Sequence, residues 1–215
     1  MSCVTRVYLA RHGRTAWNRE EIFRGRIDVP LDELGRRQAH ALGQALAHAG
    51  IGVVVSSPLS RALETARIAC SCWDSHGPRP YPAFTDLSFG EWEGLSRQQV
   101  EEHYPELYRK WATDPASVTF PGGESLALVE ERAWPALQGL AETYAGETIL
   151  VVTHRVVCKV LLGRALGAGL GAFWRIRQDT ACLNLLEWRG DRVEVVRMND
   201  TCHLRPLEES DRTDF

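Results

Sequence analysis

Short, β-branched apolar runs alternate along this chain with longer amphipathic stretches, and this alternation restricts the fold more than any other feature. The runs at residues 4–10, 52–56 and 148–152 have the length and composition of buried strands. The stretches between them carry apolar residues at helical spacing. Strands that alternate with helices in this way predict an α/β fold.

Further elements follow from the same periodicity and from turn residues. We expect helices at residues 31–49, 57–70, 96–103, 105–113, 126–144 and 155–166. Ser57 is expected to cap the second of these helices, and Pro135 to bend or interrupt the fifth. A short strand within residues 74–82 and a strand pair at residues 181–188 and 192–198 complete the pattern. Because no linker, repeat or low-complexity block divides residues 1–215, we expect a single domain.

The charge balance and the apolar content exclude several classes of protein. The formal net charge of -3 gives no overall attraction for nucleic acid. No uninterrupted apolar stretch approaches the roughly twenty residues that span a bilayer, and the N-terminus lacks a secretory apolar region. Six cysteines without zinc-ligand spacing are expected to be reduced thiols. The sequence therefore predicts a cytoplasmic protein with no nucleic-acid partner and no membrane segment.

Cationic and imidazole side chains stand at the ends of three expected strands. Arg11 and His12 follow the first strand. Arg61 lies just after the second, and His154 ends the third. In parallel α/β sheets, ligands collect at this edge, beside the N-termini of helices. Because a phosphate carries about −1.5 to −2 charge near neutral pH, we expect these four side chains to form a phosphate pocket.

Five sequence blocks, in order, resemble the histidine phosphatase superfamily, also called phosphoglycerate-mutase-like. The first block is Arg11-His12-Gly13, with Thr15 and Asn18 behind it. The other blocks are residues 56–62, 89–94, 121–125 and 151–154. The resemblance covers nearly the whole chain, and it implies a three-layer α/β/α sandwich with a mostly parallel central sheet.

The resemblance also implies a role for each matched residue. His12 is the expected nucleophile and would form a phosphohistidine. Arg11, Arg61 and His154 are expected to hold the phosphate oxygens. The same resemblance places Asn18 and Thr15 in the substrate site. Neither a metal ion nor another cofactor is expected, because arginines neutralise the charge on the phosphate.

Two positions depart from the family pattern. Asp86 stands where many members have glutamate, and it is the expected general acid that protonates the leaving alkoxide. Because aspartate is one methylene shorter, Glu91 or Glu93 is an alternative for that role. Arg155 follows the second histidine, where the family often has glycine, and it is expected either to line the pocket or to point to solvent.

The substrate signal comes from residues 103–111, 120–125 and 199–204, which look like the metal-independent phosphoserine phosphatases of this family. By that resemblance His203 is a candidate to bind a substrate carboxylate; otherwise it only caps the last strand. The expected partner is a small phosphorylated metabolite such as phosphoserine. Alternatives are a phosphoglycerate mutase, an α-ribazole or sugar phosphatase, and a non-catalytic phosphate-binding module. The strand pair at residues 181–198 leaves a homodimer open.

Overall fold

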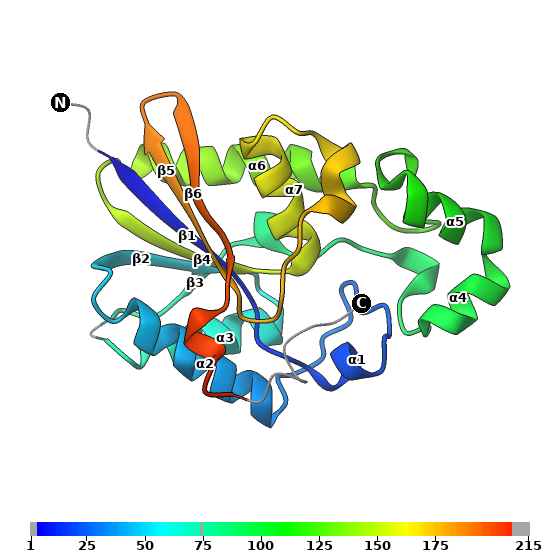
Figure 1. Cartoon of the computed structure of the whole chain (residues 1–215), viewed down its shortest axis with the longest axis horizontal. Coiled ribbons are helices and arrows are strands. Elements are labelled where there is room, and N and C mark those ends of the chain that lie inside the picture. Colours follow the sequence, from blue (N-terminus) through cyan, green and yellow to red (C-terminus); the bar gives the residue numbers. More distant parts are fainter. Residues whose placement is uncertain (1–3, 74, 208–215) are drawn as a thin grey trace.

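A six-stranded sheet forms the centre of the structure, a computed structural model that describes residues 4–73 and 75–207 (Figure 1). The strands are β1 (Thr5–Arg11), β2 (Ile51–Ser56), β3 (Arg79–Pro80), β4 (Thr148–Thr153), β5 (Leu183–Arg189) and β6 (Arg192–Asp200). Their order across the sheet is β3-β2-β4-β1-β5-β6. The first four in this order are parallel, whereas β5 runs antiparallel to β1, and β6 antiparallel to β5. The predicted mostly parallel sheet is therefore confirmed.

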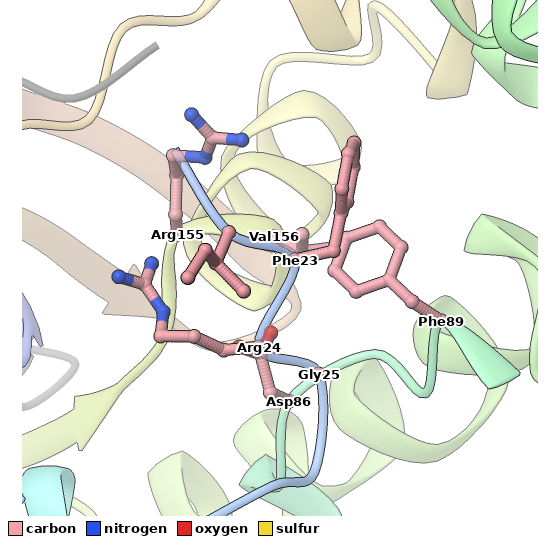
Figure 2. A pocket seen from close by; sticks show the side chains of 8 residues that line it. Phe23, Arg24, Gly25, Asp86, Phe89, Arg155 and Val156 are labelled. Carbon is pink, nitrogen blue, oxygen red and sulfur yellow. The ribbon is translucent and has the colours of Figure 1, made fainter. Parts of the chain in front are cut away.

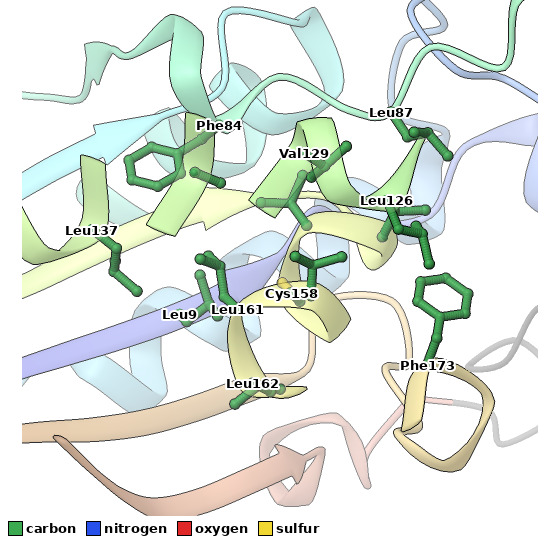
Figure 3. Packing of buried hydrophobic residues seen from close by; sticks show 14 of the residues in the cluster. Leu9, Phe84, Leu87, Leu126, Val129, Leu137, Cys158, Leu161, Leu162 and Phe173 are labelled. Carbon is green, nitrogen blue, oxygen red and sulfur yellow. The ribbon is translucent and has the colours of Figure 1, made fainter. Parts of the chain in front are cut away.

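Helices cover both faces of this sheet, which confirms the predicted three-layer α/β/α sandwich (Figure 1). The outer layers are α2 (Glu33–Leu46) and α3 (Ser60–Cys70) on one face, and α6 (Leu126–Thr143) and α7 (Arg155–Ala165) on the other. Consecutive residues of β1 point to opposite faces. Ala10 packs in the core beneath α2 and α3, whereas Leu9 packs with Leu137 and Leu161 of α6 and α7 (Figure 3). β1 is buried on both sides only toward its C-terminal end, where Leu9 and Ala10 face opposite layers; Arg6 near its start is exposed.

The remaining elements lie at the edges of the sandwich. They are α1 (Ala16–Arg19), α4 (Arg97–His103), α5 (Pro105–Thr113), and the 3-10 helices η1 (Pro82–Phe84), η2 (Gly90–Trp92), η3 (Pro115–Ser117), η4 (Leu170–Arg175) and η5 (Cys202–Leu204). Aromatic rings join several of them: Phe89 lies 5.1 Å from Phe23 and 4.9 Å from Phe120, centroid to centroid. These edge-to-face contacts hold the segments that border the site described below. No helix within the described residues is long and apolar enough to cross a membrane.

Two helix starts differ from the prediction. α2 begins at Glu33, two residues later than expected, because Asp32 caps it by accepting a hydrogen bond from Gly35 N at 2.8 Å. α3 begins at Ser60 with Leu59 as its cap, so the assignment of the capping role to Ser57 was wrong. The physical reason is that Ser57 extends the pairing of β2 with β4, its N donating to Val152 O at 2.9 Å.

The middle of α6 and the end of α2 also bear on the prediction. Of the two expected effects of Pro135, bend or interruption, interruption is wrong, because α6 continues through the proline with Ala133 and Leu137 on either side fully buried in the core. Packing of this face outweighs the backbone hydrogen bond that proline cannot make. α2 ends at Leu46 rather than at residue 49, and the cap residue Ala47 closes a tighter turn with Gln44 O.

Candidate active site

Two neighbouring parallel strands place the two histidines of the site. His12 follows β1 and His154 follows β4, and His12 N donates to Thr153 O at 2.9 Å. Both side chains are almost fully buried, and their ring centroids lie 5.2 Å apart. The loop after β1 runs so close to α2 that a Cβ on Gly13 would clash with Gly35 O. The sheet thus brings together two histidines that are far apart in the sequence.

The His12 ring is held in one tautomer. Its Nδ1 lies 2.7 Å from Gly13 O, and a carbonyl only accepts, so Nδ1 carries the proton and Nε2 a lone pair. Nε2 is buried and makes no hydrogen bond within the described part of the chain. Burial lowers the pKa of His12 well below its ordinary value, and the charges of Arg61, Arg11 and Arg24 lower it further. The ring is therefore neutral near pH 7, with a nucleophilic nitrogen inside the site.

Two fully buried arginines stand beside these rings. Arg11 Nη1 donates to Gln178 O at 2.7 Å. Arg61 donates through Nη1 to Ile27 O at 2.9 Å and through Nη2 to Gly25 O at 2.7 Å. Neutral carbonyls orient a guanidinium without cancelling its charge.

Asp86 reaches the same place from the loop after η1. Its Oδ2 lies 3.3 Å from Arg61 Nη2 and 3.5 Å from His154 Nδ1, and its Oδ1 accepts from Leu87 N at 2.9 Å. Burial raises the pKa of Asp86, although the charges of Arg61 and Arg24 oppose that rise. A carboxyl group in this environment can hold a proton and release it to a neighbour.

The two alternative acids have other partners. Tyr104 Oη donates to Glu91 Oε2 at 2.9 Å, on the exposed side of the aromatic cluster. Glu93 Oε1 accepts from Phe89 N at 3.0 Å, from Ser88 Oγ at 3.1 Å and from Arg26 N at 3.1 Å. Neither carboxylate contacts the histidines, whereas Asp86 approaches His154.

The backbone of Asp86 is held by residues that the sequence did not point to. Arg132 Nη2 donates to Asp86 O at 3.1 Å, and its Nη1 to Ala83 O at 2.7 Å. Glu124 orients this guanidinium, at 3.1 Å from Nη2, and also pairs with Arg26 at 2.8 Å. Glu124 belongs to the block at residues 121–125 that resembles the family. Arg132 lies within α6, and nothing in the sequence around it indicates a role in the site.

Thr15 and Asn18 form the turn that opens α1. Asn18 Oδ1 accepts from Thr15 N at 2.9 Å and from Thr15 Oγ1 at 3.0 Å. The side-chain amide nitrogen is the only group of Asn18 that can donate a hydrogen bond to a phosphate from this side chain. Arg24 Nη1 also donates to Thr15 Oγ1, at 3.3 Å. This turn therefore connects the loop of His12 to Arg24.

A pocket opens beside Asp86 (Figure 2). Its lining residues are Ile22, Phe23, Arg24, Gly25, Asp86, Phe89, Arg155 and Val156. Figure 2 shows the guanidinium groups of Arg24 and Arg155 on one side and the rings of Phe23 and Phe89 on the other. Of the two expectations for Arg155, the structure therefore favours the one in which it lines the pocket.

His203 lies beside the backbone of His12 rather than among the described residues that line this pocket. Its Nε2 lies 3.0 Å from Ala181 O, a pure acceptor, so the ring donates there. Ala181 N in turn donates to His12 O at 3.1 Å. The ring thus supports the backbone of the site, and recognition of a carboxylate by His203 stays a prediction.

A protein family and a relative of similar length match this chain over most of its residues. The histidine phosphatase superfamily (branch 1) matches residues 7–201, and the chain belongs to this superfamily. Phosphoserine phosphatase 1 of Hydrogenobacter thermophilus is 31% identical over 201 residues, which cover 94% of this chain and 95% of that protein.

Two further similarities extend this result. The bifunctional protein Rv2228c of Mycobacterium tuberculosis is 39% identical over 202 residues; these cover 93% of this chain but only 55% of that protein. Among solved structures, Bacillus stearothermophilus YhfR has a TM-score of 0.89 and 30% sequence identity, covering 94% of this chain and 100% of that one. Family and fold agree, and the Hydrogenobacter thermophilus relative, matched over 95% of its length, is named as a phosphatase.

Proposed function

We propose that this protein hydrolyses a small phosphomonoester through a phosphohistidine on His12 Nε2. One observation carries the proposal: that nitrogen is buried, neutral and without a hydrogen bond within the described residues. Polar atoms buried in this way cost free energy unless something binds them. The neighbouring charges of Arg61 and Arg11 fit a ligand that is anionic.

The reaction proceeds in two displacements at phosphorus. His12 Nε2 attacks and forms an N–P bond, while the P–O bond to the leaving alcohol breaks and Asp86 donates its proton to that oxygen. Arg11, Arg61 and His154 hold the other phosphate oxygens and offset their charge. Water then attacks phosphorus, Asp86 takes its proton, and the N–P bond breaks to release inorganic phosphate. The two arginines do the work of charge neutralisation, so this reaction needs no metal ion.

For the substrate we propose L-phosphoserine or a close analogue that bears a carboxylate near the phosphate. Arg155 and Arg24 supply cations at the pocket, on the side away from the phenyl rings. A guanidinium binds a carboxylate through two parallel hydrogen bonds. The name of the Hydrogenobacter relative is consistent with this choice.

A phosphoglycerate mutase is the second candidate, because the same two arginines suit a substrate that carries a second anionic group. Incubation with 3-phosphoglycerate separates the two activities: a phosphatase releases inorganic phosphate, and a mutase returns an isomer. A non-catalytic binding module would release neither product.

The test is a phosphate-release assay on L-phosphoserine, 3-phosphoglycerate, α-ribazole phosphate and p-nitrophenyl phosphate. We expect His12→Ala to abolish turnover while the protein stays folded, and His40→Ala, an exposed histidine on α2, to behave as the parent. Acid-labile, alkali-stable radiolabel on the parent after a quench with 32P-substrate is the expected sign of the phosphohistidine. Substantial turnover by His12→Ala contradicts the proposal.

A further inference from the structure

The two histidines of the site are held through different ring nitrogens. His12 turns Nε2 inward, with Nδ1 bonded to Gly13 O. His154 turns Nδ1 toward Asp86 Oδ2 at 3.5 Å, and its Nε2 lies 2.7 Å from Ser57 Oγ. Ser57 is fully buried, so no bulk water competes for this contact. The tautomer of His154 therefore depends on what the Ser57 hydroxyl does.

The donors and acceptors around Ser57 Oγ determine the direction of its hydrogen bond with His154. Ser57 Oγ accepts from Leu59 N at 3.3 Å, so one acceptor position is in use. The hydroxyl has one proton to donate. Among the described residues that contact Ser57 Oγ, His154 Nε2 is the only one that can accept it. If Nε2 carried the proton, Ser57 Oγ would accept twice and its own buried proton would lack a partner, which is unfavourable.

We infer that Ser57 is a positioning residue: its hydroxyl donates to His154 Nε2 and thereby fixes the proton of the neutral ring on Nδ1. This inference deepens the proposed function, because it makes His154 a hydrogen-bond donor toward the phosphate beside Asp86. The backbone supports this geometry, since Ser57 N donates to Val152 O, two residues before His154. The Gly13 carbonyl thus leaves a lone pair on His12 Nε2, and the Ser57 hydroxyl leaves a proton on His154 Nδ1.

Removal of this hydroxyl leaves the proton of His154 without a fixed position. In Ser57→Ala the ring can place its proton on Nε2, and Nδ1 then offers a lone pair to the phosphate oxygens and repels them. We expect kcat for the best substrate to fall about 10-fold to 100-fold, as when the outer partner of a metal-bound histidine is removed. Ser57→Thr, which keeps the hydroxyl, is expected to recover most of the activity.

Imidazole 15N chemical shifts test the inference without any substrate. In the labelled parent near pH 7, the His154 resonances are expected to show a protonated Nδ1 and a bare Nε2; comparison with His154→Gln assigns them. Ser57→Ala should shift the ring toward the other tautomer. Ser56→Ala is the matched control: Ser56 is equally buried, but its hydroxyl donates to Ser57 O at 2.8 Å and not to the ring.

The outcomes separate this inference from the proposed function. A parent ring protonated on Nε2, or an unchanged tautomer in Ser57→Ala, overturns the role of Ser57, whatever the activity. A tautomer that responds as expected, in a protein that hydrolyses no phosphomonoester, supports the role of Ser57 and rejects the proposed function. Thermal unfolding of each variant shows whether a loss of activity reflects a loss of folded protein.

Discussion

Asp86 Oδ2 lies 3.3 Å from Arg61 Nη2 in a site where both side chains are buried. Burial raises the pKa of the Asp86 carboxyl and lowers the pKa of the Arg61 guanidinium, while each charge opposes the effect of burial on the other. These opposing effects act on the carboxyl that the proposed mechanism uses as the proton donor. If Asp86 protonates the leaving group, the activity lost on replacing Asp86 should depend on how much that leaving group needs a proton.

Asp86→Asn is expected to lower kcat for L-phosphoserine by about 100-fold to 10,000-fold, the usual contribution of a general acid. The loss for p-nitrophenyl phosphate should be much smaller, because nitrophenolate leaves without a proton. The ratio of kcat for the two substrates measures this effect. Glu91→Gln is the control and should resemble the parent; a selective loss in Glu91→Gln instead would move the acid role to Glu91.

Arg155→Met is expected to raise KM for L-phosphoserine about 10-fold or more, since a hydrogen bond to a charged group contributes about 1.5–3 kcal/mol. KM for p-nitrophenyl phosphate, which has no carboxylate, should change little. Arg164→Met removes an arginine from the last turn of the same helix and is the matched control. Equal changes for both substrates would show that Arg155 does not read the carboxylate.

Arg132→Met keeps the bulk of the side chain but removes the 2.7 Å donor to Ala83 O and the 3.1 Å donor to Asp86 O, which keeps only the long 3.5 Å contact with Arg26 Nε within the described residues. We expect a loss of about 1–3 kcal/mol in the free energy of unfolding, because partly buried carbonyls become unsatisfied. We also expect kcat to fall more than KM rises, since the general acid loses its support. Urea unfolding and steady-state kinetics measure the two effects. Arg97→Met, which breaks an exposed pair with Glu101, should cost less than about 1 kcal/mol.

Stability should fall on acidification because His12 and His154 stay neutral in the fold. Burial lowers the pKa of both rings well below the ordinary value of 6.5. Below that pH the unfolded chain binds protons that the folded chain does not, so the free energy of unfolding falls by about 1.4 kcal/mol per pH unit for each ring. Asp86, whose pKa is raised in the fold, contributes in the opposite direction: its protonation on acidification favours the folded chain.

Comparison with His154→Gln isolates the contribution of one ring from that of Asp86. Urea unfolding at about pH 7.5 and about pH 5.5 should give a shallower pH dependence for the variant than for the parent. An identical slope in the two proteins would mean that His154 is protonated in the fold as readily as in the unfolded chain.

Activity is expected to survive an excess of EDTA. In the proposed mechanism the charge on the transferring phosphate is offset by Arg11 and Arg61, whose guanidinium groups donate to backbone carbonyls. Phosphate release before and after chelation measures this directly. Loss of activity that Mg²⁺ restores would contradict the proposed mechanism.

The sequence predicted those parts of the molecule whose signals are local. The apolar runs of β1 and β4 are short, rich in β-branched residues and largely buried, so they were identified as strands from the sequence. His12 and His154 follow those strands directly, and their convergence follows from parallel pairing. Asp86 was assigned as the general acid only by its distance from the block at residues 89–94. The sequence of a loop does not show which charged side chains will lie next to a carboxylate in it.

The contacts that hold the site were not predictable, because they join distant segments through the backbone. Arg132 acts on two carbonyls of another loop, and Arg11 on the carbonyl of Gln178. Ser57 was interpreted as a helix cap because serine before proline often has that role. Its actual hydrogen bond to His154 depends on the register between β2 and β4, which a single sequence does not specify.

The position of β1 in the sheet has a consequence for the synthesis of the protein. β1, which leads into His12, is made long before its neighbours in the sheet, β4 (Thr148–Thr153) and β5 (Leu183–Arg189). A ribosome adds about 5–20 residues per second, so β1 emerges well before either partner exists. Pairing over such sequence separations is slow. A nascent chain therefore carries an incomplete site until β4 and β5 have been made and have paired with β1.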